Sequence, residues 1–562
     1  MRLKGLGVSA GIGIGTAYVI KEYVADVSRK AAGRDEIGRF NRAVESLSSI
    51  LGEMAAAVIG EQAEILESHI ILLSDPVMLA DIENMILSEQ CNSEYAVNTV
   101  FENYAEIFTQ TGDELLMMRA GDMRDIKNNL LAIMNGHELP NLSLIPEDCI
   151  LVADELTTSL AAGIDEKLTS GLITNIGGPT SHMAIIARSM ELPAVAGIAN
   201  ISEIRHGVGL IIDGDSGEVI VNPTESEIAE YQALANEISI KKKALEKYRG
   251  TPGKTLDGRH IELCANIGLE TDIQKASESD ADGVGLFRTE FLFMNRNAAP
   301  SEEEQFAVYK KAALAFGKRP VIIRTLDVGG DKEIPYLGLE KEENPFLGWR
   351  AIRYCIDNRE VFAAQIRAIL RASAFGFVKI MLPMISDIRE FRRSKALIND
   401  MKRELMEQGI DYDMHINVGI MIETPAAAIM ADVLAREADF FSIGTNDLTQ
   451  YVMAVDRGNQ KVAGLYSVYN PAVLRLIRDV ANAALLRNIP CGICGEAGAD
   501  PLLTKFLIGC GINELSMTHS SILEVKSIIC RTNYSETKAM ISESINQLAD
   551  VEAATAFLRL LL

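Results

Sequence analysis

The sequence contains no apolar run long enough to cross a membrane. A membrane-spanning helix needs about 20 consecutive apolar residues, whereas runs such as Val418–Ile422 have only the length of a strand. The N-terminus carries Arg2 and Lys4, but a glycine-rich stretch follows them in place of the apolar segment of a secretory signal. We therefore expect a cytoplasmic protein without membrane insertion.

Positive charge is also scarce. The chain has 54 Lys and Arg against 78 Asp and Glu, which gives a formal net charge of −24. Nucleic acids and anionic membranes attract proteins mainly through Lys and Arg. The composition therefore argues against nucleic acid as a partner and favours a basic protein instead.

Cysteine is too sparse for a disulfide scaffold, with eight residues in a chain of 562. Cys491 and Cys494 form the only C-x-x-C pair, so a closed zinc site, which needs four ligands, is not expected. We predict that both lie on one strand, where residues three apart face opposite sides. The nucleotide-binding pattern G-x-x-x-x-G-K-[ST] is absent, which argues against ATP as a phosphoryl donor.

The length and the apolar patterns predict several domains, because single cores stop growing at about 250 to 300 residues. Between about residues 35 and 135, apolar residues recur at spacings of three and four, as in a helical bundle. Asp75-Pro76 is a predicted break between two of its helices. Strand-like runs follow at Ile150–Ala153, Gly171–Ile176 and Gly209–Ile212, which indicates a compact α/β unit. A helical stretch then ends at Gly250 and predicts a linker.

The second half alternates short apolar runs with helical patterns. Eight such alternations over roughly 300 residues predict a (β/α)8 barrel. The predicted strands are Ile261–Ala265, Gly283–Phe287, Val321–Thr325, Val378–Leu382, Val418–Ile422, Phe440–Ile443, Pro490–Cys494 and Asn513–Ser516.

Charged and polar residues stand at the carboxyl ends of these runs, where barrel enzymes carry their active sites. They are Arg288, Arg324, Glu423, Asn446, Asp447 and Cys494. Arginines bind carboxylate and phosphate groups through a planar fork, and paired carboxylates are ligands that Mg²⁺ prefers. A protonated thiol can donate a proton. Any one of these residues alone could belong to an ordinary salt bridge, but together they predict a phosphoryl-transfer site.

Several longer motifs resemble one known family. Residues 177–188 (GGPTSHMAIIAR) are similar to the phosphohistidine signature of the phosphoenolpyruvate (PEP)-utilising enzymes. Five further segments resemble the PEP-binding barrel of the enzyme I family of the bacterial PEP-dependent sugar phosphotransferase system. These are 285–294 (GLFRTEFLFM), 324–327 (RTLD), 344–350 (NPFLGWR), 443–450 (IGTNDLTQ) and 491–496 (CGICGE).

The resemblance implies a multidomain α/β fold. It implies a phosphohistidine α/β domain at 1–30 and 140–225, an inserted helical bundle at 31–139, a helical linker at 226–252 and a PEP-binding (β/α)8 TIM-type barrel at 253–562. The bundle would dock HPr, a small histidine-phosphorylated carrier, and the barrel would form a homodimer.

The resemblance also implies the roles of the site residues. His182 would take the phosphoryl group of PEP and pass it to HPr as the first step of sugar uptake, with release of pyruvate. Arg288, Arg324, Asn446, Asp447 and Arg457 would bind PEP, Glu423 and Asp447 would hold Mg²⁺, and Cys494 would protonate the enol carbon.

The residues around His182 agree with this role. His182 follows a strand and a Gly-Gly turn and is expected to open a helix with Thr180 or Ser181 as N-cap, where free backbone N–H groups favour a phosphate. An imidazole is a competent nucleophile because it can be neutral near pH 7. Two positions depart from the family pattern: Pro179 replaces the usual Arg, and Thr158 replaces the usual Pro.

Three alternatives differ from this interpretation. A pyruvate phosphate dikinase or PEP synthase shares the histidine domain and barrel but needs an ATP-binding domain, for which no segment is free. A non-catalytic regulator would not need the polar residues at the strand ends. A barrel enzyme such as pyruvate kinase leaves the first 250 residues unexplained.

Overall fold

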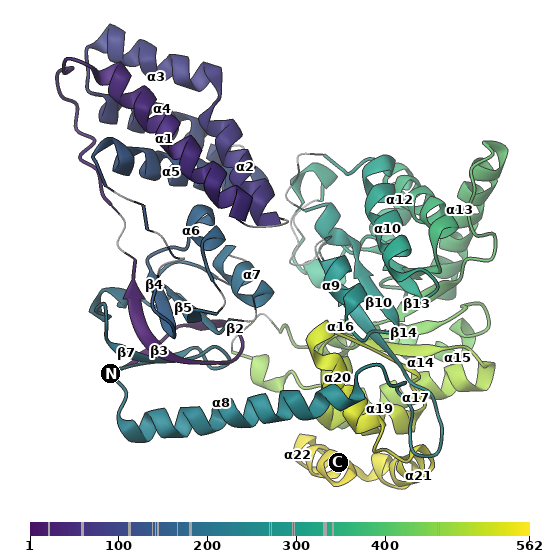
Figure 1. Cartoon of the computed structure of the whole chain (residues 1–562). Coiled ribbons are helices and arrows are strands. Elements are labelled where there is room, and N and C mark those ends of the chain that lie inside the picture. The colour runs from purple at the N-terminus through teal and green to yellow at the C-terminus, as the bar shows by residue number, and fades with distance from the viewer. Residues whose placement is uncertain are drawn as a thin grey trace. The chain divides into compact units, whose positions relative to one another are not determined.

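The computed structural model describes residues 1–562 except 21–22, 58–60, 111–113, 138, 141, 143–144, 166, 179–181, 191, 269, 271, 295, 297, 330–333, 340–341, 458 and 460. The chain forms two compact units, Met1–Lys242 and Lys243–Leu562 (Figure 1). Among the described helices, none is both long and apolar enough to cross a membrane.

The first unit contains a mixed eight-stranded sheet in the order β1-β8-β7-β3-β4-β5-β6-β2. Strands β3 to β6 are parallel, and the other pairs in the sheet are antiparallel. The strands are β1 (Arg2–Lys4), β2 (Leu6–Ser9), β3 (Ile12–Val19), β4 (Cys149–Ala153), β5 (Thr169–Thr174), β6 (Ala194–Ala196), β7 (Gly209–Asp213) and β8 (Glu218–Val221). Helices α6 (Thr158–Ala162) and α7 (His182–Ser189) lie in the connections on either side of β5.

A helical bundle is inserted between β3 and β4 (Figure 1). Its helices are α1 (Glu36–Ala57), α2 (Glu61–Leu73), α3 (Pro76–Glu89), α4 (Ser93–Gln110) and α5 (Glu114–Met134). Apolar residues of α1 at helical spacing, such as Phe40 and Leu47, are fully buried in the bundle core. The predicted break is confirmed, because the Asp75 side chain accepts hydrogen bonds from the backbone N–H groups of Val77 and Met78 and so caps α3.

A buried carboxylate joins the bundle to the α/β part. Asp125 on α5 accepts hydrogen bonds from the backbone N–H (3.1 Å) and hydroxyl (3.0 Å) of Ser159 on α6, and from the amide of Asn129 (3.1 Å). Burial raises the pKa of Asp125 even though Ser159 stabilises its charged form. These contacts fix the first turn of α6 against the bundle.

Helix α8 (Glu225–Leu245) carries the chain from the first unit into the second and contains no buried residue. Beyond it, the chain is anchored to the barrel by Lys526, which is 1% exposed. The Lys526 ammonium donates to the Thr251 carbonyl at 2.8 Å and forms an ion pair with Asp280 at 2.5 Å. Asp280 in turn accepts from the backbone N–H of Gly250 at 2.9 Å.

The second unit is a closed barrel in which every neighbouring pair of strands is parallel. This confirms the predicted TIM-type barrel. Its strands are β9 (Glu262–Ile267), β10 (Gly283–Arg288), β11 (Val321–Arg324), β12 (Val378–Leu382), β13 (Val418–Ile422), β14 (Phe441–Gly444), β15 (Cys491–Cys494) and β16 (Glu514–Met517). All eight overlap the predicted runs.

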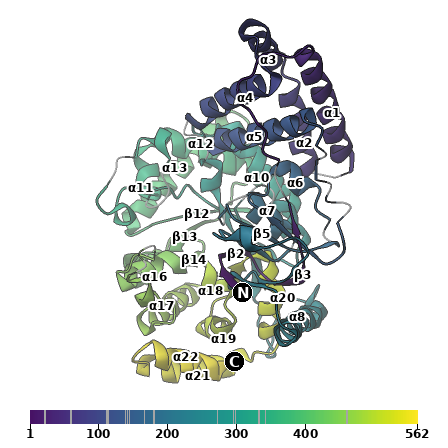
Figure 2. The ribbon, with the colours of Figure 1, turned by 90° about the vertical axis from the view of Figure 1, so that its left-hand side faces the viewer.

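Helices surround this barrel, and α12 and α13 pack on each other beside β12 (Figure 2). The helices are α9 (Asp272–Glu278), α10 (Glu302–Phe316), α11 (Ile352–Asp357), α12 (Arg359–Ala372), α13 (Ile388–Glu407), α14 (Pro425–Ile429), α15 (Ala431–Leu434), α16 (Thr445–Met453), α17 (Pro471–Arg487), α18 (Glu496–Ala499), α19 (Pro501–Cys510), α20 (Ile522–Ile529), α21 (Tyr534–Ser544) and α22 (Val551–Leu561).

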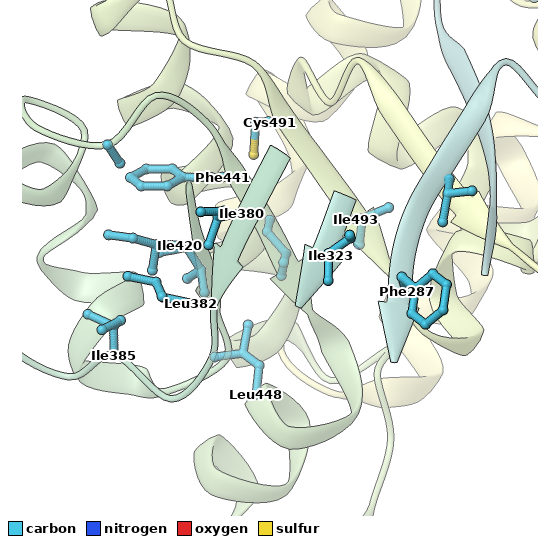
Figure 3. Close-up of a cluster of buried hydrophobic side chains, with 14 of the residues drawn as sticks. Phe287, Ile323, Ile380, Leu382, Ile385, Ile420, Phe441, Leu448, Cys491 and Ile493 are labelled. Atoms are coloured by element: carbon cyan, nitrogen blue, oxygen red, sulfur yellow. The ribbon is translucent and has the colours of Figure 1, made fainter. Parts of the chain in front are cut away.

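Side chains along each strand point alternately toward the surrounding helices and into the barrel. Outward side chains such as Ile323, Ile420 and Cys491 join the large core between strands and helices (Figure 3). A second, smaller cluster lies inside the barrel and consists of Leu286, Ile322, Met381, Met421, Phe440 and Cys494. The prediction that the two cysteines of β15 face opposite sides is therefore confirmed.

Candidate active site

The carboxyl ends of the barrel strands bring the predicted site residues to one rim. Arg288, Arg324 and Cys494 are the last residues of β10, β11 and β15, and Glu423 directly follows β13. Asn446 and Asp447 are the second and third residues of α16, which directly follows β14. Because the strands are parallel and form a closed barrel, these ends lie on the same side.

Three buried carboxylates lie together at this rim. One oxygen each from Asp327, Glu423 and Asp447 lies within 4.8 Å of the others. Glu423 is 2% exposed, and one of its oxygens accepts a hydrogen bond from the backbone N–H of Met384 at 2.6 Å. Burial, together with the charges of Asp327 and Asp447, raises the pKa of Glu423. The crowded negative charge favours a bound cation.

Two buried arginines hold this carboxylate cluster in place. The Arg324 guanidinium donates to Glu290 at 2.6 Å and forms an ion pair with Asp327 at 2.9 Å. The Arg350 guanidinium lies 2.8 Å from Asp327 and 3.3 Å from Asp447. Both pKa values stay above the usual range, because these carboxylates outweigh the effect of burial. The arginines are therefore permanently charged.

The sequence-based prediction gave no role to Asp327 or Arg350. Each lies inside a motif that resembles the family, Asp327 three residues after Arg324 and Arg350 at the end of residues 344–350. The local signal for Asp327 is a charge close to the end of an apolar strand, which many surface residues share, whereas Arg350 lies in the connection before α11, away from any strand end.

Arg457 lies at the edge of the site. Its side chain is 37% exposed, and its guanidinium is 3.9 Å from an Asp447 oxygen. Arg288 is half-buried at the end of β10. Asn446 also reaches the rim, since a Cβ added at Gly495 would lie 3.1 Å from its side-chain oxygen. Gly495 has a φ of +96°, so glycine both permits this turn and leaves room for Asn446.

Cys494 is a buried thiol facing the same site. It is 2% exposed, and its sulfur lies 3.6 Å from the carbonyl oxygen of Ile443. Burial raises the pKa of Cys494 to about 11, although Arg324 and Arg288 act in the opposite direction. The group is consequently protonated at neutral pH and can act as a proton donor.

The donor atoms of the carboxylate cluster suit a hard divalent cation. Mg²⁺ is usually bound through one or two carboxylates, with water and substrate oxygens completing the octahedron. Glu423 and Asp447 provide such oxygens, and Asp327 adds a third. The residues present therefore fit the expected Mg²⁺.

His182 is the first residue of α7. Its side chain and residues 179–181, including Pro179 and the predicted caps Thr180 and Ser181, lie outside the described part of the structure. Behind it, Ala184 and Ala187 are fully buried and fasten α7 to the core of the α/β part. The role of His182 thus stays a prediction at this point.

Helix α2 departs from the expected docking surface in part. From the sequence, the helical segment Glu61–Pro76 is expected to offer a docking surface with Glu64, Glu67 and Asp75 beside Ile65, Leu66, Ile70 and Leu73. Leu66 and Leu73 are instead fully buried in the bundle core, because they lie on the face that packs against its other helices. Glu67 is exposed, and so are the apolar side chains of Ile71 on α2 and of Val77 at the start of α3. The side chains of Glu64 and Ile65 lie outside the described residues.

Comparison with known proteins finds family models that match along the chain. Three family models of PEP-utilising enzymes match in order: the N-terminal domain at residues 4–119, the mobile domain at 145–217 and the PEP-binding domain at 242–534. An NMR solution structure of enzyme I (nEIt) matches 42% of this chain and 99% of its own length, with 36% identity and a TM-score of 0.39.

Two named relatives match nearly the whole chain. The phosphoenolpyruvate-protein phosphotransferase of Staphylococcus carnosus is 41% identical over 553 residues, which covers 97% of this chain and 96% of that protein. The protein of the same name from Haemophilus influenzae is 42% identical over 554 residues, with the same coverage of both chains. The chain therefore belongs to the PEP-utilising enzymes and, within them, to the phosphoenolpyruvate-protein phosphotransferases.

Proposed function

We propose that this phosphotransferase moves the phosphoryl group of PEP to His182 in a Mg²⁺-dependent reaction, releases pyruvate, and then passes the phosphoryl group to a histidine of HPr. In this proposal it acts in the cytoplasm as a homodimer formed through the barrel and begins the uptake of sugars. The observation that carries the proposal is the barrel rim, where buried arginines, three carboxylates and a protonated thiol converge.

The arginines account for substrate binding. Arg288 and Arg324 would bind the negative groups of PEP, with Asn446 and Arg457 at the edge. Arg350 and Glu290 act on the neighbouring groups: Arg350 bridges Asp327 and Asp447, and Glu290 orients Arg324. Bound at Glu423 and Asp447, Mg²⁺ would neutralise phosphoryl oxygens and so lower the barrier to transfer.

The chemical step breaks the bond between phosphorus and the enol oxygen of PEP and forms a bond between phosphorus and a ring nitrogen of His182. The electron pair left on the enol oxygen forms the carbonyl, and the terminal carbon takes a proton to give pyruvate. Cys494 is proposed as the donor of this proton, because its raised pKa keeps it protonated at neutral pH.

The first unit would carry the accepted phosphoryl group. We assign residues 1–30 and 140–225 to the phosphohistidine domain, 31–139 to the bundle that docks HPr, 226–252 to the linker and 253–562 to the barrel. The N-terminus of α7 offers backbone N–H groups near His182. Exposed Glu67, beside exposed Ile71, supports docking of a basic carrier.

The test is incubation of the pure protein with PEP and Mg²⁺, followed by mapping of acid-labile phosphate. We expect phosphate on His182 and release of one pyruvate per phosphate, both lost in His182→Ala. Phosphate on another residue would contradict the assignment. Phosphorylation that requires ATP would favour the dikinase alternative.

A further inference from the structure

A second cluster of ligand-type side chains lies at the opposite end of the barrel from the rim. Glu262 and Glu514 are the first residues of β9 and β16, and they face each other in the strand register. Cys264 is two residues further along β9 and therefore lies on the same face as Glu262. Leu263 and Ala265 belong to the outer core, so Glu262 and Cys264 point into the barrel.

The three side chains converge. One carboxylate oxygen from each glutamate and the Cys264 sulfur all lie within 4.8 Å of one another. Cys264 is fully buried and Glu514 is 5% exposed, whereas Glu262 is half-buried. An ion could therefore reach the cluster from the Glu262 side.

Glu514 lacks a partner inside the barrel. Its Oε1 atom is buried, and among the described residues it has no hydrogen-bond partner. Two glycines make room for this oxygen: a Cβ added at Gly285 would lie 2.6 Å from it, and one at Gly492 would lie 3.0 Å away. A buried charge without a partner is costly, so the Glu514 carboxylate needs a bound proton or cation.

The surroundings favour uptake of positive charge. Burial, with a contribution from Glu262, raises the pKa of Glu514 to about 8, while Lys379 acts against this. Burial, Glu514 and Glu262 also raise the pKa of Cys264. The Lys379 ammonium lies 5.1 Å and 5.5 Å from the ring centroids of Phe377 and Phe440 and makes no ion pair with Glu514. Lys379 therefore compensates the cluster only in part.

We propose that Glu262, Cys264 and Glu514 bind a divalent cation of the zinc class, at a site separate from the Mg²⁺ site of the rim. The thiol selects this class, because Zn²⁺ and Cd²⁺ accept thiolate and carboxylate ligands whereas Mg²⁺ prefers oxygen alone. Three protein ligands leave one position of a tetrahedral site for water, on the side of half-buried Glu262. Binding displaces the protons of Cys264 and Glu514 into solvent. The proposal does not depend on the transfer reaction.

The experiment is a Cd²⁺ titration of the full-length protein after treatment with a chelator. Ultraviolet absorption reports formation of a thiolate–Cd²⁺ bond, and elemental analysis after desalting reports the number of ions bound. We expect one thiolate-bound ion in the wild type and none in Cys264→Ser. In Glu514→Gln, which keeps the side-chain shape, affinity should fall by more than about 10-fold, since loss of even an outer partner of a ligand costs that much.

Two matched cysteine variants serve as controls. Cys491→Ser changes a buried thiol on the outer face of β15, and Cys494→Ser changes the thiol beside the rim carboxylates. Both should keep the absorption band. In addition, Zn²⁺ should raise the melting temperature of the wild type but not that of Glu514→Gln.

Three results would overturn the proposal. They are persistence of the absorption band in Cys264→Ser, loss of the band in Cys494→Ser, and absence of any thiolate-coordinated Cd²⁺ in the wild type. In the last case the two glutamates are balanced by a shared proton only. If Cys264→Ser fails to fold, the Cd²⁺ affinity of Glu514→Gln decides: the expected loss of affinity supports the proposal, and an unchanged affinity overturns it.

Discussion

Replacement of the two cysteines of β15 separates catalysis from packing. Cys491 and Cys494 are each 2% exposed, but Cys491 faces the helices and Cys494 faces the barrel interior. Each change to Ala removes one buried sulfur from an apolar cluster. Both variants should therefore lose stability to a similar extent, within the roughly 0.5 to 3 kcal/mol typical of single substitutions.

Their rates should differ strongly. Loss of a general acid slows a reaction by about 10²- to 10⁴-fold, which corresponds to about 3 to 5 kcal/mol in the barrier. Because the thiol of Cys494 has a pKa of about 11, it is almost fully protonated at neutral pH. Its removal should therefore cost the full rate contribution of a general acid. Cys494→Ala should lose pyruvate formation to this extent, whereas Cys491→Ala should stay within about threefold of the wild type.

The assay combines two measurements on each variant. Single-turnover mixing with PEP and Mg²⁺ gives the rate of pyruvate release, and urea unfolding gives the stability. Equal rate losses in the two variants would refute the reasoning, as would a normal rate in Cys494→Ala. A rate loss that follows the loss of stability would indicate a packing effect instead.

Three further predictions follow from the structure. Glu423→Gln should stabilise the metal-free protein. Because the pKa of Glu423 is raised in the folded state, the wild type loses stability as the pH rises from the usual carboxyl range toward the folded value. The gain in the free energy of unfolding, measured in urea, should therefore be larger at pH 8 than at pH 5, and an equal gain at both would contradict this. Asp75→Ala should cost about 1 kcal/mol in the same assay through loss of the α3 cap, while unchanged stability would show that the two hydrogen bonds contribute nothing. Glu67→Lys should slow phosphate transfer to HPr and weaken its dependence on salt without affecting phosphorylation by PEP, and a wild-type transfer rate would exclude α2 as part of the docking surface.

The barrel was largely predictable because its signals are local. Each strand is a short apolar run bounded by helical patterns, and parallel strands in a closed barrel necessarily bring their carboxyl ends to one rim. The sequence alone therefore places Arg324 and Cys494 at the same rim. The opposite orientation of Cys491 follows from strand geometry alone.

Other features depend on contacts that the sequence does not encode locally. Asp327 and Arg350 pair within the long connection after β11, and they become part of the site because Arg350 also contacts Asp447 on α16. Helix α2 contains four consecutive apolar residues, Ile70–Leu73, so its pattern does not reveal which side faces the core. The structure shows Leu73 inside and Ile71 outside, which the periodicity could not decide.

Helix α8 has a consequence for how the chain unfolds. Cooperative unfolding spreads through buried contacts, and none of the residues Glu225–Leu245 is buried. The helix therefore joins the two units mechanically but carries little folding cooperativity between them. Calorimetry should resolve more than one heat-absorption peak, and a single free energy of unfolding will not describe the whole chain. Hydrogen exchange along α8 should be fast while both units are still folded, because its backbone hydrogen bonds open without disturbing either core.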